Sequence, residues 1–121
     1  MKSEVGFMLL LAASTGASAQ QVVPVHEEPR HHLVLERPPF QILDVGFSPG
    51  DTTLFHVHDA PIHYVVINGS PINSQVLGEA WPTVDSTGNS ALPVGSGSWN
   101  LEYAREPVTH RVANIGTACF V

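Results

Sequence analysis

Polar and apolar positions alternate over short stretches of residues 33–121, and the 3.6-residue period of an amphipathic helix is not convincing anywhere after residue 19. Alternation or β-branched enrichment predicts strands at residues 33–35, 40–47, 52–58, 62–68, 98–103, 108–113 and 117–121. Turn residues such as Pro49-Gly50 and Asn68-Gly69 separate them. Residues 70–94 are the least informative. The pattern predicts an all-β fold, a sandwich or a barrel.

Three histidines, the residues with the clearest metal-binding potential, lie between two of these turns. His56 and His58 are two positions apart, so on a strand both imidazoles point to one face, as a pair of metal ligands would. His63 is at an odd offset and would face away on an unbroken strand. Pro61 predicts a bend that allows His63 to return to the same pocket. His110 is distant in sequence and would have to join by folding.

The N-terminus is typical of a secretory signal. A short charged start is followed by the apolar run Val5–Ala13 and the cleavage-type sequence Ala17-Ser18-Ala19. A membrane anchor is the alternative, but the run is shorter than the roughly 20 residues that a spanning helix needs. We therefore predict a signal peptide at 1–19, an extended N-terminal arm at 20–32 and one β-barrel domain at 33–121. The protein would be exported, periplasmic or secreted, with no stable membrane anchor after cleavage.

Charge excludes two classes of partner. After residue 19 the chain has no lysine and only four arginines against ten acidic residues, and the whole chain has a formal net charge of −6. Nucleic acid and anionic membrane surfaces are therefore not expected partners. All seven histidines follow residue 19, which favours metal or proton chemistry. The single cysteine, Cys119, lies in an apolar run and is expected to be buried. His31-His32 is interpreted as a polar entry to a strand.

The spacing of these residues resembles the two motifs of the cupin family. The first family motif is Gly, five residues, His-x-His, three or four residues, Glu, six residues and Gly. Here Gly50 precedes His56-x-His58 by five residues, His63 stands where Glu is usual, and Gly69 follows. The second motif ends Pro-x-Gly-x-x-His-x-x-x-Asn. Here Arg105 stands in place of the Pro and Pro107 in place of the Gly, whereas His110 and Asn114 keep the family spacing.

The resemblance covers about residues 40–120 and implies a cupin-type double-stranded β-helix, a jelly-roll barrel. Because the chain stops inside an apolar run, we expect further strands in a longer, C-terminally complete protein. In the family, one divalent metal ion (Fe, Cu, Mn, Ni or Zn) lies inside the barrel. Carried over, its ligands would be His56, His58, His63 and His110. Ligation by imidazole alone suits Cu, Zn, Ni or Fe better than Mg or Ca.

Three functional hypotheses follow. The first is an exported metal-dependent enzyme acting on a small organic molecule, an oxygenase of the dioxygenase type if the metal is redox-active, and an isomerase or hydrolase if it is not. The second is a non-catalytic cupin module that binds a metal or small ligand. The third is a partial chain that does not fold by itself. The resemblance also implies a homodimer.

Overall fold

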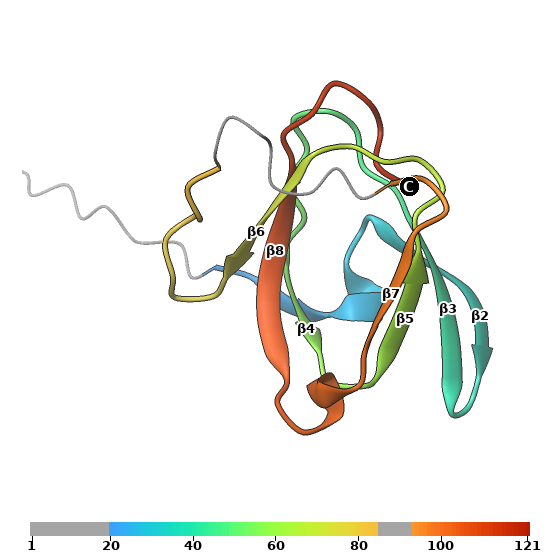
Figure 1. Ribbon diagram of the computed structural model, residues 1–121. Coiled ribbons are helices and arrows are strands. Elements are labelled where there is room, and N and C mark those ends of the chain that lie inside the picture. Colours follow the sequence, from blue (N-terminus) through green and yellow to red (C-terminus); the bar gives the residue numbers. More distant parts are fainter. Residues whose placement is uncertain (1–19, 85–92) are drawn as a thin grey trace, which may run out of the picture.

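The protein is all-β in the part that the computed structural model describes, residues 20–84 and 93–121 (Figure 1). The predicted signal peptide at 1–19 lies outside the described residues. Within them, no helix has the length and apolar character needed to cross a membrane. The described elements are β1 (Val22–Pro24), η1 (Val25–Glu27), β2 (His31–Arg37), β3 (Phe40–Val45), β4 (Phe55–His58), β5 (Ile62–Val65), β6 (Ile72–Val76), β7 (Gly97–Asn100), η2 (Glu102–Ala104) and β8 (Val108–Asn114).

The strands form one four-stranded sheet and two ribbons. The sheet has the order β1-β4-β8-β6, in which β1 is parallel to β4 and the other pairs are antiparallel. The ribbons are β2-β3 and β5-β7, both antiparallel. In Figure 1 the β4 and β8 strands stand across the molecule from the β5-β7 ribbon. The described strands do not join into a closed barrel.

The segment between β3 and β4 turns as its sequence predicts. Asp51 N–H donates to Ser48 O at 3.0 Å, and Ser48 N–H donates to the Asp51 carboxylate at 3.1 Å. Gly50 has φ +83°, a backbone conformation that side chains disfavour. The turn returns the chain into β4, where Phe55 and Val57 alternate with His56 and His58. Alternation therefore puts both histidines on one face of the sheet.

Strand β6 was not predicted, because residues 72–76 have apolar side chains only at their two ends. Long-range pairing with β8 forms this strand, and two side-chain contacts reinforce it. Ser74 Oγ lies 2.8 Å from His110 Nδ1, and Gln75 Oε1 accepts a 2.6 Å hydrogen bond from Arg111 Nε. Neither contact is visible in local sequence, so propensity alone gave no signal for this strand.

Five predicted strands are shorter in the structure. The strands predicted at 40–47 and 52–58 are shortened to β3 (Phe40–Val45) and β4 (Phe55–His58). The strand predicted at 62–68 ends at Val65, and the one predicted at 98–103 ends at Asn100. Asn100 Oδ1 accepts a hydrogen bond from Glu102 N–H, which starts the turn of η2. The strand predicted at 117–121 is reduced to a bridge between Phe120 and Phe47.

The expectation that Cys119 is buried was wrong, because it lies in this irregular segment and is exposed. Its carbonyl accepts a hydrogen bond from the Asn68 side chain, which holds the backbone at the surface.

Residues 20–32, expected as an extended arm, form β1, η1 and the first two residues of β2. Strand β1 pairs in parallel with β4, so Val23 lies beside His56. The short η1 turn then leads to Glu28, whose side chain is fully buried. Within this segment, β1 is therefore an edge strand of the histidine-bearing sheet, and the residues after it lead into the separate β2-β3 ribbon.

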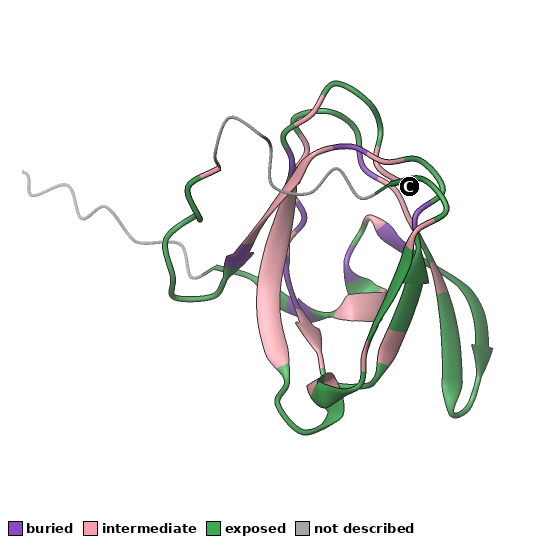
Figure 2. Cartoon of the chain, in the orientation of Figure 1, coloured by how far each residue is buried: buried purple, intermediate pink, exposed green. Residues whose placement is uncertain are grey.

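The interior of the described protein is unusually polar. Its buried apolar side chains are Val23, Phe47, Phe55 and Val66, whereas seven polar or charged residues are buried. Figure 2 shows buried residues on β4, toward the end of β6 and in several loops, while β2 after its first residue is exposed and β3 is mostly exposed. Buried polar groups cost stability unless they are paired, so these groups require specific partners. The buried polar residues are Glu28, His31, Thr53, His56, Ser70, Gln75 and Asn114.

Candidate metal centre

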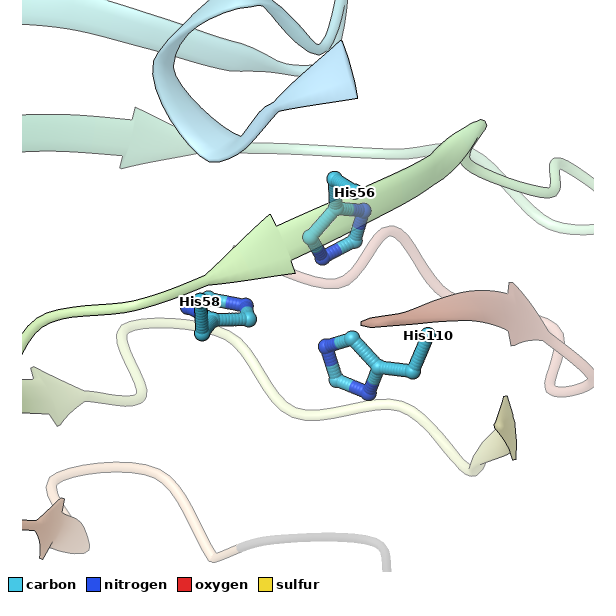
Figure 3. Close-up of side chains that lie close together, drawn as sticks. All are labelled: His56, His58 and His110. Carbon is cyan, nitrogen blue, oxygen red and sulfur yellow. The ribbon is translucent and has the colours of Figure 1, made fainter. Parts of the chain in front are cut away.

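Three histidines from two neighbouring strands converge in the interior (Figure 3). His56 and His58 come from β4, and His110 comes from β8, directly opposite His56 in the antiparallel register. One potential ligand atom from each residue lies within 4.8 Å of the other two. Zinc–nitrogen bonds are about 2.0–2.1 Å long, so small side-chain rotations would bring all three nitrogens onto one ion. The group could therefore hold a metal ion.

Outer hydrogen bonds orient two of these rings. His56 Nδ1–H donates to Leu54 O at 3.0 Å, and because a carbonyl only accepts, Nε2 of His56 keeps its lone pair. His110 Nδ1 shares a 2.8 Å hydrogen bond with Ser74 Oγ. Ligating histidines typically have their second nitrogen fixed in this manner.

Two ring nitrogens within the group lack any hydrogen-bond partner among the described residues. His110 Nε2 and His58 Nδ1 are both buried and unpaired. An unpaired buried polar atom costs free energy, and coordination of a cation by its lone pair would remove that cost. The donor set therefore fits a transition-metal ion that accepts imidazole nitrogen.

Burial keeps the three imidazoles neutral. Burial, followed by repulsion from nearby histidines, lowers the pKa of His56 to about 4 and that of His110 to about 4. Burial, followed by repulsion from His110 and His56, lowers the pKa of His58 to about 3. Neutral imidazole is the form that binds metal, so the site is prepared for a cation at neutral pH.

His63, the fourth ligand expected from the motif, lies outside this group. It is exposed on β5, pairs with Trp99 of β7 and packs against the Trp99 ring at 6.1 Å between ring centroids. The bend at Pro61 does not reverse the facing of the strand, because Ile62 is the partly buried position and His63 follows it outward. The structure thus brings together three of the four predicted ligands.

Sequence analysis missed a buried pair beside the group. His31 is 9% exposed, and its ring packs on that of His56 with 4.6 Å between centroids. His31 Nδ1–H donates to Glu28 Oε2 at 2.7 Å. The interpretation of His31 as a polar strand entry overlooked this partner. The available signal was Glu28 three residues before His31, a spacing at which a tight turn lets two side chains meet.

Glu28 remains ionised in this setting. Burial by itself raises the pKa of Glu28, but hydrogen bonds from His31 and from the N–H groups of Leu54 and Arg30 outweigh burial and hold the pKa below its ordinary value. Burial lowers the pKa of His31, and the bond to Glu28 offsets only part of that effect. The pair is therefore a carboxylate and a neutral imidazole.

A half-open cavity of about 550 Å³ is lined in part by His58, whereas His56 and His110 are not part of its wall. Tyr103 of η2 lies against the His58 ring, with 5.5 Å between centroids. The cavity wall is mainly apolar and has no lysine or arginine, so it suits a small molecule that carries no strong negative charge. The wall consists of Val22, Val23, Pro24, Val25, His26, Gln41, Val57, His58, Asp59, Ala60 and Ile62.

Comparison of the chain with protein-family models, with curated proteins and with solved structures finds no match. The functional argument therefore rests on the site itself, which offers three neutral imidazoles, two unpaired buried nitrogens and an adjoining cavity. Three ligands leave coordination positions open on any common transition metal, and open positions are what metal-assisted chemistry requires.

Proposed function

We propose that this protein binds one divalent transition metal ion through His56, His58 and His110. The observation that carries the proposal is the convergence of three potential ligand atoms within 4.8 Å, two of whose rings are held from outside by Leu54 O and Ser74 Oγ. Imidazole ligands favour Zn, Cu, Fe or Ni over Mg and Ca. His63, exposed on β5, takes no part in this version of the site.

We further propose that the chain is an exported cupin-like protein with the jelly-roll topology of that family. The spacing of Gly50, His56, His58, His110 and Asn114 supports the family proposal, and the all-β fold is consistent with it. Export rests on the sequence of residues 1–19. N-terminal sequencing of protein recovered outside the cytoplasm tests export, since cleavage at the proposed site would give Gln20 as the first residue.

The activity proposed is oxygenase-type chemistry on a small organic molecule. Support comes from the open coordination positions and from the mainly apolar cavity that reaches His58. A redox-active metal at this site would supply the electron transfer, while the protein would bind the substrate in the cavity and limit access of water. The alternative is a non-catalytic module in which the same site holds a metal or small ligand.

Elemental analysis of the purified chain is the decisive first experiment, alongside a His56→Ala/His58→Ala double variant. The metal proposal predicts about one equivalent in the parent and almost none in the double variant. Iron, copper or manganese in the parent would favour an oxygenase and justify measuring O2 consumption with candidate substrates. Zinc or nickel would favour isomerisation, hydrolysis or binding. A folded parent that takes up no metal after reconstitution would refute the proposal.

A homodimer is proposed for the oligomeric state. Support comes from the β2-β3 ribbon, whose apolar side chains Leu33, Val34, Leu35, Phe40 and Ile42 are all exposed in the single chain. Exposed apolar patches commonly mark protein interfaces. Sedimentation equilibrium of the parent and a Val34→Glu/Ile42→Glu variant tests this proposal, which predicts a dimer and a monomer respectively.

A further inference from the structure

Glu28 is the most completely buried acid among the described residues, with no exposed side-chain surface. Its carboxylate accepts three hydrogen bonds, from Arg30 N–H at 2.7 Å, from His31 Nδ1–H at 2.7 Å and from Leu54 N–H at 3.0 Å. Burying an ionised carboxylate is costly, even with this number of partners. The position of the charge therefore calls for a reason beyond folding.

Two routes lead from this carboxylate to one proposed metal ligand. Through Oε2, Glu28 fixes His31, whose ring packs on His56 at 4.6 Å between centroids. Through Oε1, it holds the N–H of Leu54, the same residue whose carbonyl accepts from His56 Nδ1–H. Glu28 thus constrains the His56 imidazole both by packing and through the backbone.

The negative charge of Glu28 would also compensate part of the positive charge of a bound metal ion. Three neutral imidazoles leave the full charge of a divalent ion uncompensated, and the ligand group contains no carboxylate. Arg30 balances part of the Glu28 charge, with Nη1 at 3.7 Å from Oε1, but its Nε also lies 3.5 Å from the Asp51 carboxylate. The guanidinium is therefore shared between two acids.

We propose that Glu28 is the outer anchor and counter-charge of the metal centre, acting on His56 through His31 and Leu54. This inference rests on the proposed metal site. It assigns Glu28 and His31 as positioning residues rather than ligands, since His31 lies beside the three-histidine group and outside it. Partners of this kind typically change metal affinity by about 10- to 100-fold when they are removed.

The test is the Zn²⁺ dissociation constant of the full chain and its variants, measured by competition with a chromophoric chelator. Glu28→Gln is expected to raise the constant by about 10- to 100-fold. Glu27→Gln is the matched control, because it removes an equal charge from an exposed neighbouring side chain. The control is expected to match the parent. Equal affinity of the parent and Glu28→Gln, with metal bound by both, would overturn this inference and leave the metal proposal standing.

The Arg30→Met variant shows whether Glu28 acts as a counter-charge to the metal ion or only supports the fold. Removing this cation leaves the Glu28 charge less compensated, so Zn²⁺ binding should tighten by about 2- to 20-fold. If Glu28 only supported the fold, loss of its partner would weaken binding instead, and that outcome overturns the proposal. Thermal unfolding of each metal-free variant shows whether it is folded. If Glu28→Gln does not fold and Arg30→Met does not tighten binding, the carboxylate is structural and the inference fails.

A parent that binds no Zn²⁺ would refute the metal proposal together with this inference. The Co²⁺ form provides a second readout. Because Glu28 orients His56, its loss should change the visible absorption of bound Co²⁺ even at saturating metal, whereas Glu27→Gln should give the parent spectrum. An unchanged spectrum in saturated Glu28→Gln would argue against positioning of His56.

Discussion

His56 and His110 occupy directly opposed positions of the antiparallel β4-β8 pair, and their ring centroids lie 4.7 Å apart. This register brings together two of the three histidines of the candidate site, although they are 54 positions apart in the chain. A one-residue slip of β8 would send His110 to the opposite face of the sheet. The pairing of these two strands therefore determines whether the site exists.

The first prediction separates the three converging histidines from His63. His110→Ala should lower Zn²⁺ affinity by more than about 100-fold, because removing a ligand costs more than removing an outer partner. His63→Ala should retain the parent affinity and stoichiometry, since His63 is exposed beside Trp99. Chelator competition measures the Zn²⁺ affinity of each variant, and elemental analysis after dialysis measures its metal stoichiometry. Loss of metal in His63→Ala would show instead that the four-ligand version of the motif operates.

The second prediction concerns the outer contact of His110. Ser74→Ala removes the hydroxyl that shares a 2.8 Å hydrogen bond with His110 Nδ1 and should weaken Zn²⁺ binding by about tenfold or more. Ser98→Ala on exposed β7 is the control and should have no effect. Chelator competition gives both constants. Equal constants for Ser74→Ala and the parent would mean that the serine does not orient the ligand.

The third prediction concerns acid sensitivity of the metal-free protein. The pKa values of His56 and His110 are about 4 and that of His58 is about 3 in the folded state, below the ordinary histidine value near 6.5. Between these values the unfolded chain binds more protons than the folded chain. The free energy of unfolding should therefore have its full value above about pH 6.5 and decrease steadily as the pH drops toward 4.

Urea unfolding at a series of pH values measures this dependence. A His56→Phe/His58→Phe/His110→Phe variant should lose most of the slope between pH 6.5 and 4, because its buried rings no longer titrate. Saturating Zn²⁺ should shift the onset of acid unfolding in the parent to lower pH, since metal competes with protons for the same nitrogens. A parent with no slope in this window would contradict the burial of neutral histidines.

Local sequence was sufficient for part of this arrangement. The two-residue period placed His56 and His58 on one face, and the turn at Gly50 was evident from its residues. The partnership with His110 depends on strand register, for which no local signal exists, and only the family resemblance indicated it. The same limit explains the missed strand β6, whose polar residues are ordered by contacts to β8.

The failure to find Glu28 and His31 has a different cause. From sequence alone, an acidic residue is assigned to the surface, because acids are rarely buried unless they are paired. Its partners Leu54 and His31 meet it only after β1 has paired with β4 and η1 has turned the chain inward. His63 is a different case, since it occupies a motif position with metal-binding chemistry but the strand places it exposed and outside the three-histidine group.

The fourth prediction concerns the outer face of the four-stranded sheet. The guanidinium of Arg111 lies 4.7 Å from the Phe55 ring centroid and 4.8 Å from that of Trp81, and its Nε donates to Gln75. Arg111→Lys should lower the free energy of unfolding by about 1–2 kcal/mol, because an ammonium cannot reproduce the planar stacking. Arg105→Lys, at an 83% exposed side chain, should change it little. Chemical denaturation compares the two variants.

The fifth prediction tests the polar interior at Asn114. Its buried side-chain Nδ2 donates to Phe47 O and Ala118 O, while Oδ1 accepts from Ser70 Oγ and Gly116 N–H. Asn114→Ala leaves several of these groups without partners, each worth about 1–3 kcal/mol when buried. The variant should therefore lose at least about 2 kcal/mol and melt roughly 8 °C or more below the parent.

Asn73→Ala is the control for Asn114, because among the described residues the Asn73 side chain makes a single, exposed hydrogen bond, to Pro82 O. That variant should melt close to the parent, since an exposed hydrogen bond is replaced by one to water. Zn²⁺ affinity of folded Asn114→Ala at low temperature should remain near the parental value, because Asn114 holds loops rather than ligands. A variant as stable as the parent would mean that water replaces these contacts and that the buried network contributes little to folding.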